Sequence, residues 1–139
     1  MGRSRIWLLK HRPLVHQLKE SAWRRLLQTG KSWDCVRGQI LCGPDDEGGQ
    51  AYLVRAGRVR INTFGPDGHE VVAGILEEGE LFGQRARVDG PASEGYVEAL
   101  SNGRVLILPQ AEIHALLARE TPLLAERLAR AMEKGASRD

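Results

Sequence analysis

The chain has 139 residues, enough for one hydrophobic core but not for two. Its net charge of +2, with 42% apolar and 27% charged residues, excludes a disordered, collagen-like or histone-like chain. No apolar run approaches the roughly 20 residues that a membrane span needs, and we identify no signal peptide. Two cysteines, Cys35 and Cys42, are too few for a disulfide framework or a four-ligand zinc site. We therefore expect a globular cytoplasmic domain that does not contact a membrane.

Charge is unevenly distributed along the chain. Residues 1–31 carry eight basic side chains and one acidic side chain, a net charge of +7, and the remaining 108 residues carry −5. The simpler interpretation is an amphipathic helix with a basic solvent face. The alternative is a surface that contacts nucleic acid, an acidic partner or the acidic body of the same subunit.

Hydrophobic periodicity begins as helix and then changes to strand. Apolar residues recur at helical spacing over residues 13–27, and Gly30 stands where this helix would end. Residues 32–108 contain short apolar runs divided by turn signals every eight to twelve residues, a pattern typical of a β-sandwich or barrel. The expected strands are residues 33–36, 39–42, 51–55, 58–63, 70–76, 81–84, 95–99 and 103–109.

The helical period returns after Pro109, first over residues 111–118 and then over 123–132. Thr121 and Pro122 are the expected N-cap and first residue of the last helix. The expected organisation is a basic helical segment over 1–31, a β-roll over 32–109 and C-terminal helices over 110–139, with no DNA-binding domain.

Four segments with the right order and spacing resemble the cyclic-nucleotide-binding domain of catabolite-activator and FNR-type bacterial regulators. They are residues 52–60, 66–72, 76–83 and 97–109, within a likeness that runs from about Pro13 to the end. The resemblance implies a mainly β fold, a double-stranded β-helix (jelly roll) of about eight strands. An N-terminal helix and two C-terminal helices would flank it, the last of them a dimerisation-type helix.

The resemblance also places a ligand pocket after Phe82. Family members that bind cyclic AMP carry a Glu after Phe-Gly, and about ten residues on an Arg that pairs with the phosphate, followed by Ser or Thr. This chain has Gln84 in place of the Glu, and Ser93 and Glu94 at the two clamp positions. We therefore expect no physiological binding of cyclic AMP, and the effector is unknown. The implied pocket residues are Gly83, Gln84, Arg85, Arg87, Ser93 and Glu94.

Arg85 and Arg87 flank Ala86, so in an extended segment both side chains point to one side. One interpretation is that they pair with Glu94 or Asp89, or extend into solvent. The other is a relocated anion site that replaces the missing clamp.

The remaining polar residues do not indicate catalysis. The four histidines are scattered, and His69 with Glu70 is too little for the three converging ligands of a metal-dependent cupin, so we expect no metal and no enzyme. If residues 33–42 form a hairpin, the residue opposite Cys35 is Ile40, which favours two buried structural thiols over a disulfide.

An apolar stripe at helical spacing on the last helix predicts a weak homodimer. Its members are Leu123, Leu124, Leu128, Ala131 and Met132. No helix-turn-helix follows, so we expect no sequence-specific DNA binding by this chain alone.

These observations leave three hypotheses. The first is the ligand-sensing effector domain of a transcription regulator that does not respond to cyclic AMP. The second is a stand-alone module that docks on another protein through its basic N-terminal helix. The third, a cupin-type enzyme, lacks the metal ligands that it would need.

Overall fold

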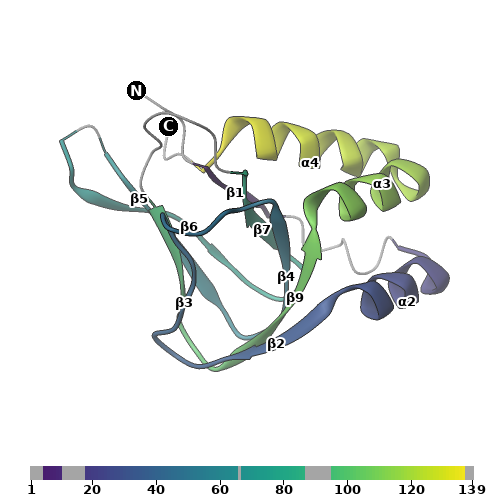
Figure 1. Cartoon of the computed structure of the whole chain (residues 1–139), viewed down its shortest axis with the longest axis horizontal. Coiled ribbons are helices and arrows are strands. Elements are labelled where there is room, and N and C mark those ends of the chain that lie inside the picture. Colours follow the sequence, from purple (N-terminus) through teal and green to yellow (C-terminus); the bar gives the residue numbers. More distant parts are fainter. Residues whose placement is uncertain (1–4, 11–17, 66, 87–94, 137–139) are drawn as a thin grey trace.

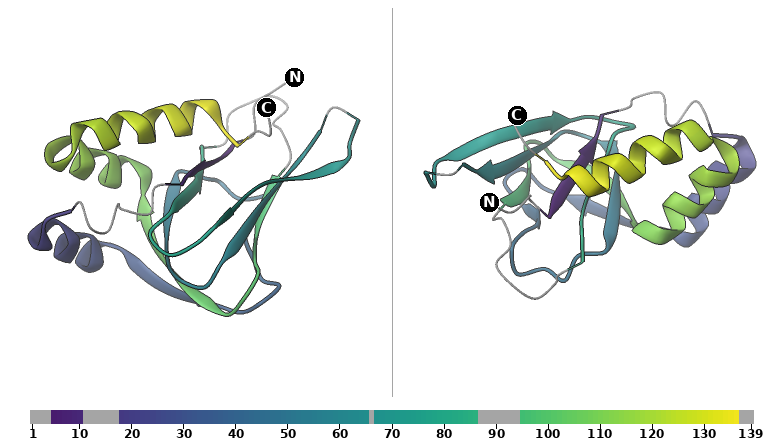
Figure 2. Two further views of the ribbon diagram at one scale, coloured as in Figure 1. Left: turned by 180° about the vertical axis from the view of Figure 1, so that it is seen from behind. Right: turned by 90° about the horizontal axis from the view of Figure 1, so that it is seen from above.

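The computed structural model describes residues 5–10, 18–65, 67–86 and 95–136 (Figure 1). Two antiparallel sheets face each other, and the helices gather beside one of them (Figures 1 and 2). The predicted mainly β jelly roll with flanking helices is therefore confirmed. The strands are β1 (Ile6–Leu9), β2 (Lys31–Cys35), β3 (Ile40–Cys42), β4 (Gln50–Ala56), β5 (Val59–Phe64), β6 (Glu70–Leu76), β7 (Leu81–Gln84), β8 (Gly95–Ala99) and β9 (Gly103–Pro109). The helices are α2 (Glu20–Thr29), α3 (Gln110–Glu120) and α4 (Pro122–Lys134).

The two sheets divide the apolar side chains between two cores. One sheet has the order β1-β7-β4-β9-β2, and the other has the order β3-β8-β5-β6. On β4, Ala51 and Leu53 join the core beneath the helices, whereas Tyr52 and Val54 join the core between the sheets. This alternation follows from the two-residue period of a strand, which sends successive side chains to opposite faces. The five-stranded sheet is therefore buried on both faces.

Strand β1 replaces part of the helical segment that the charge pattern predicts over residues 1–31. The strand pairs with the edge of β7, with Trp7 opposite Gly83, and Ile6 and Trp7 are almost fully buried. A four-residue apolar run carries too little periodicity to be distinguished from a helix start, and here the unpaired edge of β7 decides its conformation. Helix α2 begins at Glu20, and residues 11–17 of the expected helix lie outside the described residues.

The predicted hairpin over residues 33–42 is wrong, because its two strands belong to different sheets. Cys35 in β2 pairs with Gly103, and Cys42 in β3 pairs with Val97. Both thiols are free and buried in the core between the sheets. The predicted buried thiols are present, but they are positioned by long-range pairing with β9 and β8.

Helix α4 buries most of its apolar stripe inside its own subunit. Thr121 is the N-cap and Pro122 the first residue, as predicted, although the Thr121 side chain makes no capping hydrogen bond. Leu124 and Leu128 lie in the core beneath the helices, and Met132 packs partly against it. Leu123 is 79% exposed. Of the predicted dimer residues, Leu124 and Leu128 are thus unavailable at the surface, because the subunit's own sheet and α3 cover them.

Candidate functional site

Two neighbouring residues of the predicted pocket, Gly83 and Gln84, lie on strand β7 and face opposite sides of the sheet. Gly83 faces the helices, where a Cβ atom would come within 2.4 Å of the Trp7 ring and 2.5 Å of the main-chain oxygen of Gln50. Gln84 faces the core between the sheets and is only 3% exposed. The helix side of β7 therefore has no room for a ligand, and the inner side is the candidate site.

Gln84 ties the end of β7 to the loop over residues 43–49. Its Nε2 donates to the main-chain oxygen of Gly43 at 2.7 Å, and its own main-chain oxygen accepts from the N–H of Gly49 at 2.7 Å. The side-chain Oε1 is buried and has no hydrogen-bond partner among the described residues. An unpaired buried acceptor costs about 1–3 kcal/mol, so this position is not optimised for stability alone.

A cavity of about 380 Å³ lies beside Gln84 at this end of the roll. Tyr52 in the cavity wall stacks on Phe82 with a ring separation of 4.7 Å. Burial raises the pKa of the Tyr52 hydroxyl, which therefore stays neutral at physiological pH. The lining is aromatic, apolar, amide-bearing or acidic, and consists of Trp33, Leu41, Asp46, Glu47, Gly48, Gln50, Tyr52 and Gln84.

Arg5 also binds the loop over residues 43–49, a contact that the sequence did not indicate. Its side chain is buried, with 6% of the residue exposed. The guanidinium donates to the main-chain oxygens of Pro44 (3.3 Å), Asp46 (2.8 Å), Glu47 (3.0 Å) and Arg85 (3.1 Å). Only the strand conformation of β1 brings Arg5 here, so no local motif predicts this role.

The structure brings together part of the predicted pocket. Gly83, Gln84 and Arg85 are consecutive at the end of β7, and the main-chain N–H of Arg85 donates to the oxygen of Arg5 at 2.8 Å. The other predicted pocket residues, Arg87, Ser93 and Glu94, lie outside the described residues. Their place in the pocket, and the choice between an anion site and pairing with Glu94 or Asp89, stay predictions.

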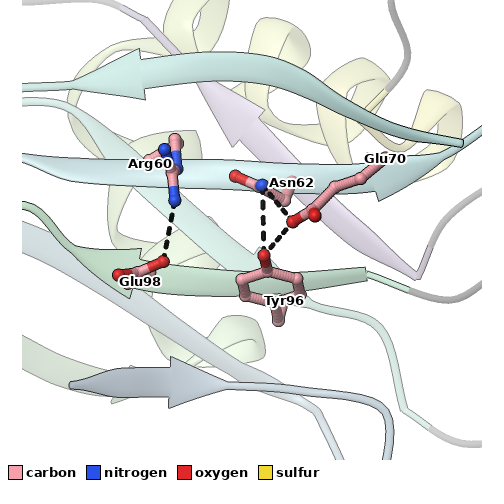
Figure 3. A network of polar contacts seen from close by, with 5 residues as sticks. All are labelled: Arg60, Asn62, Glu70, Tyr96 and Glu98. Carbon is pink, nitrogen blue, oxygen red and sulfur yellow. Dashed lines mark hydrogen bonds and ion pairs between the residues drawn. The ribbon is translucent and has the colours of Figure 1, made fainter. Parts of the chain in front are cut away.

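A polar cluster on the four-stranded sheet was not predicted (Figure 3). Asn62 donates through Nδ2 to Glu70 at 2.5 Å and to the hydroxyl of Tyr96 at 3.2 Å, and Tyr96 donates to Glu70. Arg60 and Glu98 form an ion pair at 2.9 Å on the same strands. These contacts join β5, β6 and β8. Asn62 and Arg60 lie directly opposite Tyr96 and Glu98 in the β5–β8 pairing, a long-range register that sequence periodicity does not report.

Titratable groups elsewhere are structural or exposed. His69 is exposed and lies 2.6 Å from Asp67. Burial raises the pKa of the Cys42 thiol to about 12, so this thiol is an unreactive core residue. Within the part of the chain that the structure describes, no three His, Cys, Asp or Glu residues gather as a metal site, and no helix is long and apolar enough to cross a bilayer.

Comparison with known proteins identifies the family. The cyclic nucleotide-binding domain model matches residues 34–120, from β2 to the end of α3. The Cyclic AMP receptor protein of Thermus thermophilus is 29% identical over 121 residues, which cover 87% of this chain and 56% of that protein. The chain thus spans about half the length of this curated relative.

Two solved structures of transcription regulators share the fold. The N-terminal domain of a transcriptional regulator from Streptomyces coelicolor is 25% identical, with a TM-score of 0.55, over 87% of this chain and 84% of that chain. The CO-dependent transcription factor CooA from Carboxydothermus hydrogenoformans is 20% identical, with a TM-score of 0.64, over 83% of this chain and 49% of that chain. The chain belongs to the cyclic nucleotide-binding domain family, as a domain of the catabolite-activator and FNR type.

Proposed function

We propose that the chain is the ligand-sensing effector domain of a catabolite-activator/FNR-type transcription regulator and that it does not respond to cyclic AMP. Family membership and the regulators among its relatives support the first part. The observation that carries the proposal is the inner end of β7, where a cavity lies beside Gln84, a buried glutamine that is one of the residues the sequence resemblance implies. The domain acts in the cytoplasm by binding, without catalysis.

The chemistry of the cavity argues against a cyclic phosphate. Gln84 is a neutral amide whose NH₂ is already bound to Gly43, and two acidic residues, Asp46 and Glu47, are among the cavity lining. In the sequence, Ser93 and Glu94 replace the Arg and the hydroxyl residue of the clamp. A phosphate that leaves water without gaining a cationic partner loses a few kcal/mol of binding free energy. This loss lowers its affinity by about 10²-fold or more.

Isothermal titration with cyclic AMP and cyclic GMP tests this proposal. The wild-type chain should show no saturable binding up to about 1 mM nucleotide. The double variant Gln84→Glu/Ser93→Arg should gain affinity for cyclic AMP, and Gln84→Glu alone, which lacks the cationic partner, is the matched control. Low-micromolar binding by the wild-type chain would refute the proposal.

The proposal includes a weak homodimer and no sequence-specific DNA binding by residues 1–139. Leu123 is the exposed member of the predicted stripe on α4, so the contact would be small. Light scattering at high concentration should show reversible association, which a strictly monomeric mass would contradict. A gel-shift experiment at physiological salt should show no competitor-resistant complex, since we identify no helix-turn-helix among the described residues.

A further inference from the structure

The Arg5 guanidinium bridges two parts of the candidate site that are distant in sequence. Three of its four acceptors belong to the loop over residues 43–49, and the fourth is the oxygen of Arg85, directly after β7. Asp46 and Glu47, two of the acceptors, also line the cavity beside Gln84. A planar guanidinium suits this arrangement, because its donors diverge toward several acceptors at once. Arg5 thus holds the cavity wall against the end of β7.

The loop approaches β7 so closely that only glycine fits at one position. Gly48 has a φ of +84°, and a Cβ atom there would come within 2.2 Å of the Arg85 oxygen and 2.9 Å of Nη2 of Arg5. Gly49, the next residue, has a φ of +88° but no atom within 4 Å of its Cβ position. The close contact is therefore local to the Arg5 bridge.

Strand β1 makes a second contact, with the end of α4. The main-chain N–H of Ala136, two residues after α4, donates to the oxygen of Ile6 at 2.5 Å. The strand crosses the C-terminal end of α4 (Figure 2, right) and pairs with β7 along its length. Two consecutive residues, Arg5 and Ile6 at the start of β1, thus supply the side chain that fixes the cavity wall and the oxygen that binds the end of the last helix.

We propose that Arg5 is a positioning residue for the cavity at Gln84 and that β1 couples the cavity wall to the end of α4. Calling the cavity an effector site rests on the proposed function; the coupling itself does not. Loss of the guanidinium removes a donor from four main-chain oxygens and frees the loop over residues 43–49. Strand β1 then loses its anchor at Arg5, and the hydrogen bond between Ile6 and Ala136 opens more often.

Hydrogen exchange followed by mass spectrometry on the whole chain tests the coupling. Arg5→Ala should speed exchange at least about tenfold in the loop over residues 43–49 and in the segment over 134–136, since each opens as a local unit. Arg24→Ala is the matched control, because Arg24 is exposed and, among the described residues, forms its ion pair with Glu20 on the same helix. The control should leave both segments unchanged.

Chemical rescue separates positioning from general destabilisation. Methylguanidinium at non-denaturing concentration should restore slow exchange in both segments of Arg5→Ala, because it supplies the missing donors. Methylammonium, with the same charge but no planar fork, should restore much less. Equal rescue by the two cations, or none, would overturn the role assigned to the guanidinium.

A glycine pair keeps the test valid if Arg5→Ala does not fold. Gly48→Ala should push the loop away from Arg5 and speed exchange in residues 43–49 and 134–136. Gly49→Ala carries the same backbone strain without the clash and should leave the segment over 134–136 unchanged. Unchanged exchange in the loop of folded Arg5→Ala and Gly48→Ala would overturn the proposal. Faster exchange in the loop over residues 43–49 together with unchanged exchange in residues 134–136 would overturn the coupling. This conclusion would hold whatever the cyclic AMP titration shows.

Discussion

The two faces of β7 differ in how completely they are packed. On the helix face, the Trp7 ring covers Gly83, and its Nε1 donates to Gln110 at 2.6 Å. On the inner face, Gln84 borders a cavity of about 380 Å³ and keeps an acceptor without a partner among the described residues. Close packing and complete hydrogen bonding stabilise the fold, whereas a cavity with an unsatisfied hydrogen-bond acceptor is typical of a ligand-binding site. One strand thus separates a structural core from a candidate binding site.

The largest effect should come from a charge placed in the helix-side core. Leu128→Glu should lower the free energy of unfolding by about 4 kcal/mol or more, because Leu128 is fully buried. A loss of this size is enough to unfold the domain. Leu123→Glu, at a residue 79% exposed, should leave the urea midpoint nearly unchanged and weaken any self-association. Equal stability of the two variants would show that α4 does not pack as described.

Removal of the Trp7 ring should come next. Trp7→Ala should lower the free energy of unfolding by about 3–5 kcal/mol, because the ring is fully buried beneath α4 and hydrogen-bonded to Gln110. Trp23→Ala is the control, since Trp23 is only partly buried. The guanidinium carbon of Arg55 lies 5.3 Å from the centre of its ring, in a cation–π contact. Urea denaturation compares the two, and a larger loss at Trp23 would contradict the central place of β1.

A larger side chain at Gly83 tests directly whether the helix face of β7 is fully packed. Gly83→Ala should cost about 2–3 kcal/mol, because the added Cβ meets both the Trp7 ring and the main-chain oxygen of Gln50. At Gly43, in contrast, the nearest atoms lie 3.9 and 4.0 Å from a Cβ position, so Gly43→Ala should be nearly neutral. A neutral Gly83→Ala in the same denaturation assay would mean that the helix face has room after all.

The smallest expected effect is a decrease in the free energy of unfolding at alkaline pH, caused by Cys42 in the core between the sheets. The pKa of Cys42 rises from 9.0 to about 12 on burial, so above pH 9 the unfolded chain loses this proton while the folded chain keeps it. Its contribution is complete below pH 9 and decreases as the pH rises from 9 toward 12. Cys42→Ala should flatten the fall between pH 8 and 10, measured by urea midpoints; parallel curves would contradict it.

The sequence was sufficient for the elements that periodicity and turns define. The eight strands from β2 to β9, the two C-terminal helices and the family all follow from alternating apolar runs, glycine-rich turns and four spaced motifs. The stripe on α4 was also recognised, but a stripe shows only that one face is buried. It does not say whether a second copy or the same subunit covers it, and the structure assigns Leu124 and Leu128 to the subunit.

The site was less predictable because long-range contacts build it. Gly83, Gln84 and Arg85 follow from the family motif, but the inward direction of Gln84 and its bond to Gly43 depend on two sheets meeting. Arg5 directly precedes a four-residue strand, β1, whose conformation is decided by its pairing with the edge of β7. The cluster of Asn62, Glu70 and Tyr96 likewise joins three strands, and Tyr96 is 34 residues from Asn62 in the sequence.

A residue-resolved titration of the wild-type chain with cyclic AMP tests the central claim most directly. Amide shifts of Gly83, Gln84 and the loop over residues 43–49 are followed in ¹H–¹⁵N spectra, together with the Gln84 side-chain NH₂ that donates to Gly43. We predict no saturable shift at these positions up to about 1 mM nucleotide. Saturable shifts at Gln84 and the loop with a low-micromolar dissociation constant would contradict the account, because they would place cyclic AMP in this cavity.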